Sequence, residues 1–296
     1  MNVFLTGATG FIGSHTAKKL VDDGHVVTGT GVSTERTSHC TRLLTPSLIG
    51  INWSAIRDID AIVHLAANND TLCEDEEEVM LANFYASTML FKHCMHMGCR
   101  KFVFASSAAV YGNSPSPQAE EDECVPLNPY GKSKLRFEKF AKSFAEDNGV
   151  SVVGLRYFNV YGPGEQHKGR RASMVYQIVR AVQQGRPVKL FKHGDQTRDW
   201  IHVSDVVNMT LDAMNVEGFH IVNVGTGSPR SFNDIVRAAG GTVSEYIDCP
   251  FFAAYQSKTC ASTKNAESLF GSRRFVTLEE GVRTITEDCC AGGPAS

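Results

Sequence analysis

The chain has 296 residues, of which 42% are hydrophobic, and a formal net charge of −3 at pH 7. This length allows a large buried core, and the slight acidity argues against nucleic-acid and membrane-surface proteins, which usually carry basic patches. The sequence has no apolar run long enough for a membrane span, no signal peptide, and nine cysteines without metal-ligand spacing, so we expect a cytoplasmic protein with reduced thiols and no metal.

The first half of the chain alternates short apolar runs with longer amphipathic ones. Strands are predicted at "NVFLTG" (2–7), "HVVTGTGV" (25–32), "AIVHLAA" (61–67), "KFVFASS" (101–107) and "SVVGLRYF" (151–158), and helices over 11–24, 76–97 and 129–147. This order predicts an α/β fold with a doubly wound parallel sheet of the Rossmann type. The connection between the second and third strands contains Pro46 and is short, so we expect an irregular sheet there, with "SLIGINW" (47–53) as a candidate strand.

The pattern loosens after residue 158. Helices are predicted near 172–184, 203–215, 231–239 and 278–288, with strands at "PVKLF" (187–191) and "FHIVNVG" (219–225). We therefore predict a dinucleotide-binding domain over 1–157. Residues 158–296 are predicted to form mainly a smaller substrate-binding lobe, interleaved with the first domain because segments near 200–225 return to the main sheet.

A glycine-rich loop directly follows the first strand and opens the first helix. "TGATGFIG" places Gly7, Gly10 and Gly13 at three-residue spacing. In this context the first glycine permits a tight turn, the second lets a pyrophosphate approach the backbone, and the third lets helix and strand pack closely. The N–H groups of the helix N-terminus favour an anion. This predicts a dinucleotide site, against the simpler alternative of a turn that merely needs glycine.

The residues after the second strand bear on the choice of cofactor. Sheets that bind NAD usually carry an acidic residue there, which holds the ribose 2′-hydroxyl. Thr30 or Gly31 takes that place here, and Ser33 and Arg36 follow. The missing carboxylate and the nearby arginine favour NADP over NAD, unless Arg36 is an ordinary surface side chain.

Tyr130 and Lys134 in "PYGKSKLRFEKF" are four residues apart, so a helix places both on one face. Ser106 and Ser107 end a predicted strand, and reactive groups gather at the carboxyl ends of parallel strands. Lowering the pKa of a tyrosine from near 10 by about three units requires about 4 kcal/mol. One positive charge about 4 Å away supplies about 4 kcal/mol at an effective dielectric constant of about 20. Lys134 and an oxidised nicotinamide together would therefore poise Tyr130 as a base.

Several motifs, in this order, resemble the extended short-chain dehydrogenase/reductase family, which includes the nucleotide-sugar epimerases and dehydratases. They are "TGATGFIG", "HLAA", "SSAAVYG", "YGKSK", "RYFNVYGPG" and "RDWIHVSDV". The ordered set covers essentially the whole chain and is far more specific than a tyrosine and a lysine alone. The resemblance implies a Rossmann fold, bound NAD(P), a nucleotide-diphosphate sugar as substrate, and a homo-oligomer built on the helices over 76–97 and 130–147.

The resemblance also implies roles for individual residues. Ser107 would hydrogen-bond the same substrate oxygen as Tyr130, Ser106 would be structural, and Asn83 would support the cofactor end of the sheet. Residues expected at the cofactor are Gly7, Gly10, Phe11, Ile12, Gly13, Ser33, Arg36, Leu65, Ala66, Ala67, Asn83, Tyr130, Lys134, Tyr157, Asn159 and Val160. Residues expected at the substrate are Ser107, Asn159, Lys168, Arg170, Arg171, Phe191, Arg198 and Tyr255.

Simpler structural roles remain as alternatives for some of these residues. Asn159 would then order its own loop, and Phe191 would pack in the core instead of stacking on the nucleobase. The basic loop at 166–171 would be an ordinary solvated turn, whereas the planar fork of Arg198 suits a diphosphate better. His64 and His202 are expected to be hydrogen-bonded core groups, and the acidic run at 74–78 an exposed helix start.

Two further sequence patterns narrow the choice among the reactions of this family. Ala108 and Ala109 stand where the family's dehydratases have Asp-Glu, so the acid for eliminating water is missing and epimerisation through a transient ketone is favoured. "RYFNVYGPGEQHKG" resembles the ADP-glycero-manno-heptose 6-epimerase branch, in which the lysine of an H-K-G stretch is a second acid/base. Lys168 has that place, although Arg170 and Arg171 replace the usual small residues.

Three functions are therefore carried forward. The first is an NAD(P)-dependent nucleotide-sugar epimerase similar to the heptose 6-epimerases, in which proton transfers occur on opposite faces of a ketone that rotates. The second is a UDP-hexose or UDP-hexuronate 4-epimerase, which can turn the whole sugar over and use one base twice. The third is a non-catalytic dinucleotide-binding sensor, against which the intact Ser107, Tyr130 and Lys134 argue.

Overall fold

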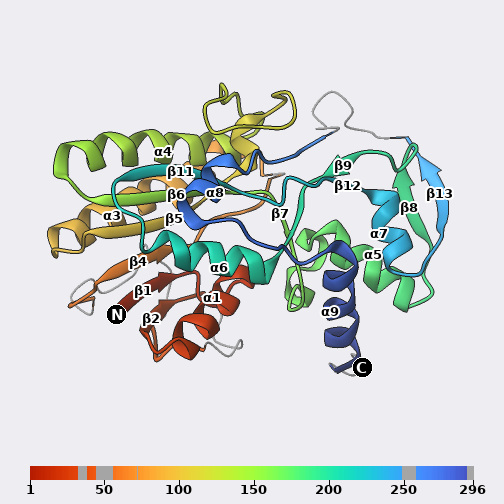
Figure 1. The fold of residues 1–296 in the computed structure, drawn as a ribbon, viewed down its shortest axis with the longest axis horizontal. Coiled ribbons are helices and arrows are strands. Elements are labelled where there is room, and N and C mark those ends of the chain that lie inside the picture. Colours follow the sequence, from red (N-terminus) through yellow and green to blue (C-terminus); the bar gives the residue numbers. More distant parts are fainter. Residues whose placement is uncertain (33–38, 45–55, 72, 249–257, 292–296) are drawn as a thin grey trace.

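The computed structural model describes residues 1–32, 39–44, 56–71, 73–248 and 258–291. Within these ranges the chain forms a large α/β layer and a smaller lobe, which lie side by side in Figure 1. The glycine-rich loop, the predicted tyrosine and lysine, and the "HKG" turn all lie in described segments, whereas Ser33, Arg36 and Tyr255 lie outside them.

Among the described residues, the main sheet has seven parallel strands in the order β11-β6-β5-β4-β1-β2-β3. They are β1 (Asn2–Thr6), β2 (Val26–Thr30), β3 (Arg42–Leu44), β4 (Ala61–His64), β5 (Lys101–Ser107), β6 (Ser151–Tyr157) and β11 (Phe219–Val224). This confirms the predicted doubly wound parallel sheet. The short edge strand β3 was not predicted, and the candidate strand at 47–53 lies outside the described residues.

Helices cover both faces of this sheet (Figure 1). One layer consists of α1 (Phe11–Asp22) and α6 (Val203–Ala213). The other consists of α2 (Glu76–Met80), η3 (Leu81–Tyr85), α3 (Ala86–His96) and α4 (Pro129–Asn148). The helix expected over 76–97 is thus present as three successive segments, of which η3 is π-helical. It begins at Asp75, whose carboxylate accepts the Glu78 N–H (2.9 Å), so the acidic run is a helix start as predicted.

Successive strand residues point to opposite faces and build two apolar cores. Leu5 of β1 packs in the core that contains Met209 of α6. Phe4, its neighbour in the strand, packs in the core that contains Phe91 of α3. The rings of Phe91 and Phe102 meet edge to face at 4.6 Å. Burial on both faces explains why these strands read as continuous apolar runs.

The smaller lobe is built from the second half of the chain, and its core gathers side chains of α5, α7, α9 and neighbouring strands. The remaining elements, including those that link the lobe to the sheet, are η4 (Ala108–Tyr111), β7 (Asn159–Tyr161), η5 (Gln166–Arg171), α5 (Met174–Gln183), β8 (Val188–Phe191), β9 (Thr197–Arg198), β10 (Trp200–His202), β12 (Arg230–Ser231), α7 (Phe232–Ala238), β13 (Val243–Ile247), α8 (Lys264–Phe270) and α9 (Leu278–Ala291). Because β11 and α6 return to the main sheet, the two parts are interleaved along the chain.

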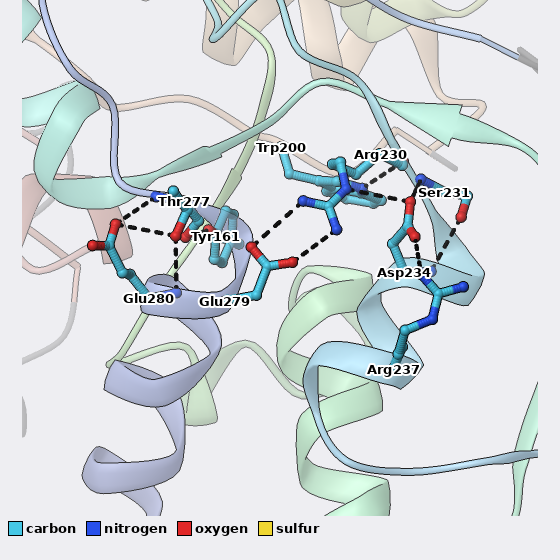
Figure 2. A network of polar contacts seen from close by, with 9 residues as sticks. All are labelled: Tyr161, Trp200, Arg230, Ser231, Asp234, Arg237, Thr277, Glu279 and Glu280. Carbon is cyan, nitrogen blue, oxygen red and sulfur yellow. Dashed lines mark hydrogen bonds and ion pairs between the residues drawn. The ribbon is translucent and has the colours of Figure 1, made fainter.

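A polar network fastens α9 to the rest of the lobe (Figure 2). Arg230 donates two hydrogen bonds to Glu279 (2.8 and 3.5 Å) and one to Asp234 (3.3 Å). The Trp200 indole N–H donates to the Arg230 carbonyl (3.1 Å). Arg230 stands opposite Arg198 in the antiparallel β9–β12 pair, so this network also fixes the strand that faces Arg198.

Two further findings concern only the part of the chain that is described. No helix there is both long and apolar enough to cross a membrane. No group of three or more His, Cys, Asp or Glu side chains there could hold a metal ion.

Candidate functional site

The glycine-rich loop joins β1 to α1 at the carboxyl end of the sheet. Gly7 has a φ of 70°, and a Cβ on it would lie 2.8 Å from the Ala66 nitrogen. A Cβ on Gly13 would lie 2.0 Å from the Gly7 carbonyl oxygen, so the first turn of α1 packs directly on the loop. Both positions require glycine, and the result is a backbone cradle at a helix N-terminus. These residues fit the pyrophosphate of a dinucleotide.

Predicted cofactor residues from three segments lie beside this cradle. Thr6 Oγ1 accepts the N–H groups of Leu65 and Ala66 (3.2 and 3.1 Å), which fixes the loop after β4 against Gly7. Phe11, Ile12 and Val160 lie on the other side and pack into one small apolar cluster. The fold therefore brings these residues together, as the sequence predicted. Ala67, the next residue along, is exposed.

The end of β2 carries no carboxylate. Thr30 is buried, and a Cβ on Gly31 would lie 2.2 Å from Thr9 Oγ1. An acidic side chain therefore does not fit at position 31 while Thr9 keeps its conformation.

Ser107, Tyr130 and Lys134 converge at the carboxyl end of β5. Ser107 is the last residue of β5, Tyr130 is the second residue of α4, and a side-chain hydrogen bond joins them. The Lys134 ammonium donates to the Ala105 carbonyl (2.8 Å) and lies 5.7 Å from the centroid of the Tyr130 ring. In the sheet only β4 separates β5 from β1, the strand that leads into the glycine-rich loop.

Burial dominates the protonation of this group. It raises the pKa of Tyr130, and the hydrogen bond with Ser107 opposes the rise only partly. It also lowers the pKa of Lys134 to about 8, against the attraction of Glu138 for the ammonium. For the protein alone, the direction for Tyr130 is therefore opposite to that required of a base. Two positive charges were expected to lower the pKa of the phenol, those of Lys134 and of the oxidised nicotinamide. Only the first belongs to the protein, so the second would come with the cofactor.

A buried ion pair lies next to Lys134. Glu138, one turn further along α4, accepts two hydrogen bonds from Arg156 of β6 (3.1 and 2.8 Å), and both side chains are 5% exposed. Ser106 donates a further hydrogen bond to the same carboxylate. Ser106 thus fastens β5 to α4, which is the structural role expected of it.

Asn83 joins the loop after β4 to α4. Its buried side chain accepts the Asn68 N–H (2.7 Å) and donates to the Asn68 carbonyl (2.9 Å) and to Ser133 Oγ (3.1 Å). Because Ser133 precedes Lys134, Asn83 links the wall of the cradle to the helix that carries the lysine. Tyr157 is also close to the core of the sheet, but its hydroxyl lies 2.8 Å from Thr210 Oγ1 of α6.

The "HKG" turn docks on the first turn of α1. The Lys168 ammonium lies 4.8 Å from the centroid of the Phe11 ring and 2.8 Å from Glu165 Oε2. His15 Nε2 on α1 lies 3.0 Å from the Pro163 carbonyl oxygen. The fold thus brings Lys168 to the helix that opens on the cradle, whereas the side chains of Arg170 and Arg171 are exposed.

The remaining predicted substrate residues are spread over the smaller lobe. The Asn159 amide donates to the Asp199 carbonyl (3.4 Å) and to Thr259 Oγ1 (3.1 Å), so it joins β7 to two segments distant in sequence and does not merely order its own loop. Arg198 is 8% exposed, and its guanidinium lies 5.8 Å from the centroid of the Phe232 ring. Phe191 ends β8 and is half-buried.

Two histidines are core groups, as predicted. His64 lies with one ring nitrogen 2.7 Å from Thr6 Oγ1 and the other 2.7 Å from Ser87 Oγ, and burial lowers its pKa to about 3. His202 lies 2.7 Å from Ser204 Oγ, and burial lowers its pKa to about 4. Both rings are therefore neutral at physiological pH.

Three carboxylates around the site are buried but were not predicted from the sequence, namely Glu138, Glu165 and Asp199. Asp199 accepts hydrogen bonds from Thr226, Gly227 and Ala261, which tie the loop after β11 to β9 and β10. Segments distant in sequence surround Glu138 and Asp199. Glu165 is instead enclosed by its own loop, through Gly162 and Ser173. The available signals were the adjacency of Asp199 to Arg198 and the place of Glu165 three residues before Lys168.

Comparison with known proteins places this geometry in context. Residues 3–225 match the model of the "NAD dependent epimerase/dehydratase family". The ADP-L-glycero-D-manno-heptose-6-epimerase of Alkalilimnicola ehrlichii is 40% identical over 253 residues, which cover 80% of this chain and 78% of that protein.

Solved structures give the same picture over the full length. MoeE5 in complex with UDP-glucuronic acid and NAD superposes with a TM-score of 0.89 at 31% identity, covering 99% of this chain and 100% of that one. The ADP-L-glycero-D-manno-heptose-6-epimerase of Helicobacter pylori superposes with a TM-score of 0.88 at 29% identity, covering 98% of this chain and 96% of that one.

Proposed function

Because the chain belongs to the NAD dependent epimerase/dehydratase family, we propose that it is an NAD(P)-dependent nucleotide-sugar epimerase of the ADP-glycero-manno-heptose 6-epimerase type. The observation that carries the proposal is the convergence of Ser107, Tyr130 and Lys134 at the carboxyl end of β5, with a second amine, Lys168, on the turn that docks on α1. An epimerase that inverts an exocyclic carbon needs two such groups.

Tyr130 is proposed to take the proton of the substrate hydroxyl, and Ser107 to hydrogen-bond the same oxygen. Lys134, held by the Ala105 carbonyl, keeps a positive charge beside the phenol. When bound, the nicotinamide supplies the hydride acceptor and a further positive charge that favours the phenolate. Tyr130 is half-buried, so the charges act on the phenol with less screening than in open solvent.

Lys168 is proposed to exchange a proton with the same substrate oxygen from the opposite face, after the ketone has rotated. Its ammonium is close to α1 and is not part of the Ser107–Tyr130 pair. Asn159, Phe191, Arg198, Tyr255, Arg170 and Arg171 are proposed to hold the nucleotide-diphosphate part of the substrate. Among them Arg198 is favoured for the diphosphate, because a planar guanidinium can donate hydrogen bonds to two phosphate oxygens at once.

For the cofactor we propose NADP in preference to NAD. The support is the steric block at Gly31, where a Cβ would meet Thr9, together with the absence of a carboxylate at Thr30. Without that carboxylate the ribose 2′-hydroxyl loses its usual acceptor. Identifying the dinucleotide released from the denatured protein by mass spectrometry tests this choice.

A 4-epimerase acting on UDP-hexose or UDP-hexuronate is the second candidate. It is favoured by the similarity to MoeE5, which was solved with UDP-glucuronic acid and NAD. Replacing Lys168 by Met separates the candidates, because it should abolish 6-epimerisation of ADP-heptose but leave 4-epimerisation of UDP-sugars within about twofold. Conversion is followed by NMR for both kinds of substrate.

Tyr130→Phe tests whether the protein is an enzyme at all. The variant should retain the dinucleotide but lose turnover, whereas a sensor should keep its binding role unchanged. Epimerisation by transient oxidation returns the same hydride, so a product formed in deuterated water should carry no deuterium on carbon. Deuterium on carbon would contradict both epimerase candidates.

We also propose a homo-oligomer that works in the cytoplasm. Leu81, Tyr85 and Met89 follow one another at four-residue spacing along η3 and α3 and are 52%, 50% and 63% exposed. Such a stripe on one helical face is typical of a subunit interface. The eight cysteines in the described segments are free thiols, which suits a reducing compartment.

A further inference from the structure

Glu165 is a fully buried carboxylate that accepts four hydrogen bonds. Its Oε1 accepts from the Gly162 N–H (3.2 Å) and the Ser173 hydroxyl (2.7 Å). Its Oε2 accepts from the Ser173 N–H (2.7 Å) and the Lys168 ammonium (2.8 Å). The side chain is 0% exposed. A buried carboxylate is stable only when it is paired and hydrogen-bonded in this way.

Three of these donors belong to the loop itself and do not depend on the lysine. Gly162 precedes the turn and Ser173 follows it, so Glu165 closes the segment that carries Lys168 into a compact loop. The Lys168 ammonium is thus bound to an anion that the rest of the loop would hold in place even without it. Glu165 is therefore an acceptor fixed by its own loop, and the side chain of Lys168 is directed towards it.

The other contacts of Lys168 lead to the cofactor end of the sheet. Its ammonium lies over the face of Phe11, the first residue of α1, at 4.8 Å from the ring centroid. Its side chain is 18% exposed, so both attractions act with limited screening by solvent. Lys168 is therefore held between an anion on its own loop and an aromatic ring beside the glycine cradle.

We infer that Glu165 is a positioning residue for Lys168, whose side-chain nitrogen it holds over Phe11 at the start of α1. The inference rests on the proposed acid/base role of Lys168, and it adds a residue that neither the motif nor the family match identifies. Removing the charge of Glu165 should leave the loop closed through Ser173 but release the ammonium.

The test compares Glu165→Gln with a matched control, Asp205→Asn. Asp205 on α6 is also a buried carboxylate that accepts a main-chain N–H, that of Val276 (2.9 Å), so the control measures the general effect of neutralising such a group. The first readout is the rate at which acetic anhydride acetylates the Lys168 amine of the full-length protein, followed by peptide mass spectrometry. The second readout is kcat and KM for epimerisation of ADP-heptose.

In Glu165→Gln we expect acetylation of Lys168 about tenfold faster and kcat at least about tenfold lower, with KM within about twofold. Asp205→Asn should change neither quantity, even if it unfolds at a lower temperature. If Glu165→Gln does not give folded protein, Glu165→Asp is measured instead, because it keeps the charge and, being one methylene shorter, should give an intermediate acetylation rate.

The two readouts separate this inference from the proposed function. Wild-type acetylation in Glu165→Gln, or in Glu165→Asp where it stands in, would overturn the inference even if Lys168→Met were inactive. Faster acetylation in Glu165→Gln combined with a fully active Lys168→Met would support the positioning contact but refute the catalytic role of Lys168.

Discussion

Replacing Lys134 by Met should make the protein more stable while it removes activity. Lys134 is 6% exposed, and burial lowers its pKa from 10.5 to about 8. Keeping it protonated in the folded protein at pH 7 therefore costs about 3 kcal/mol, at about 1.4 kcal/mol per pKa unit. The variant also loses the hydrogen bond to the Ala105 carbonyl, which offsets about 1–2 kcal/mol of the gain. We expect the free energy of unfolding to rise by about 1–2 kcal/mol at pH 7.

The pH dependence of this gain gives the sharper check. Because the folded pKa of Lys134 is depressed, the unfolded chain binds more protons than the folded protein between pH 8 and pH 10.5. The cost of the lysine is therefore fully present below pH 8 and disappears as the pH rises through this window. The advantage of the Met variant should be largest at pH 7 and should be lost or reversed at pH 10.

The assay is urea unfolding of the dinucleotide-free protein at both pH values. Lys132→Met is the matched control, because Lys132 lies on the same helix but is 47% exposed and pairs with Glu76 at 3.2 Å. It should change stability by less than about 1 kcal/mol, without a trend between the two pH values. The reasoning would be refuted if Lys134→Met were less stable than wild type at pH 7, or if its free energy of unfolding differed from wild type by the same amount at both pH values. Either result would show that burying the ammonium does not destabilise the folded protein.

Arg156→Met should lower the free energy of unfolding by about 3–5 kcal/mol in urea melts, because it leaves the buried carboxylate of Glu138 without its partner; a loss below about 1 kcal/mol would contradict this. Gly13→Ala should abolish retention of the dinucleotide on gel filtration, because its Cβ would lie 2.0 Å from the Gly7 carbonyl oxygen, and normal retention would show that the loop can shift. Met89→Glu should convert the proposed oligomer to a smaller species in light scattering, since it places a charge on the exposed apolar stripe, whereas an unchanged mass would exclude this face as the interface.

Local patterns along the chain were sufficient for the fold class and for the two motifs that the fold places at the carboxyl end of the sheet. The strands β1, β4, β5 and β6 are buried on both faces, so each appears in the sequence as a continuous apolar run. The glycine loop was identifiable because its spacing reflects contacts within one turn. Tyr130 and Lys134 were identifiable because helical periodicity alone puts them on one face.

Contacts between distant segments determined the rest. The edge strand β3 is only three residues long and is stabilised by pairing with β2, so no local sequence pattern predicted it. The burial that raises the pKa of Tyr130 comes from the packing of α4 on β5. The hydrogen-bond donors of Glu165 are local, but the contact of Lys168 with Phe11 joins segments more than 150 positions apart. That contact depends on how the loop packs against α1, which no local pattern shows.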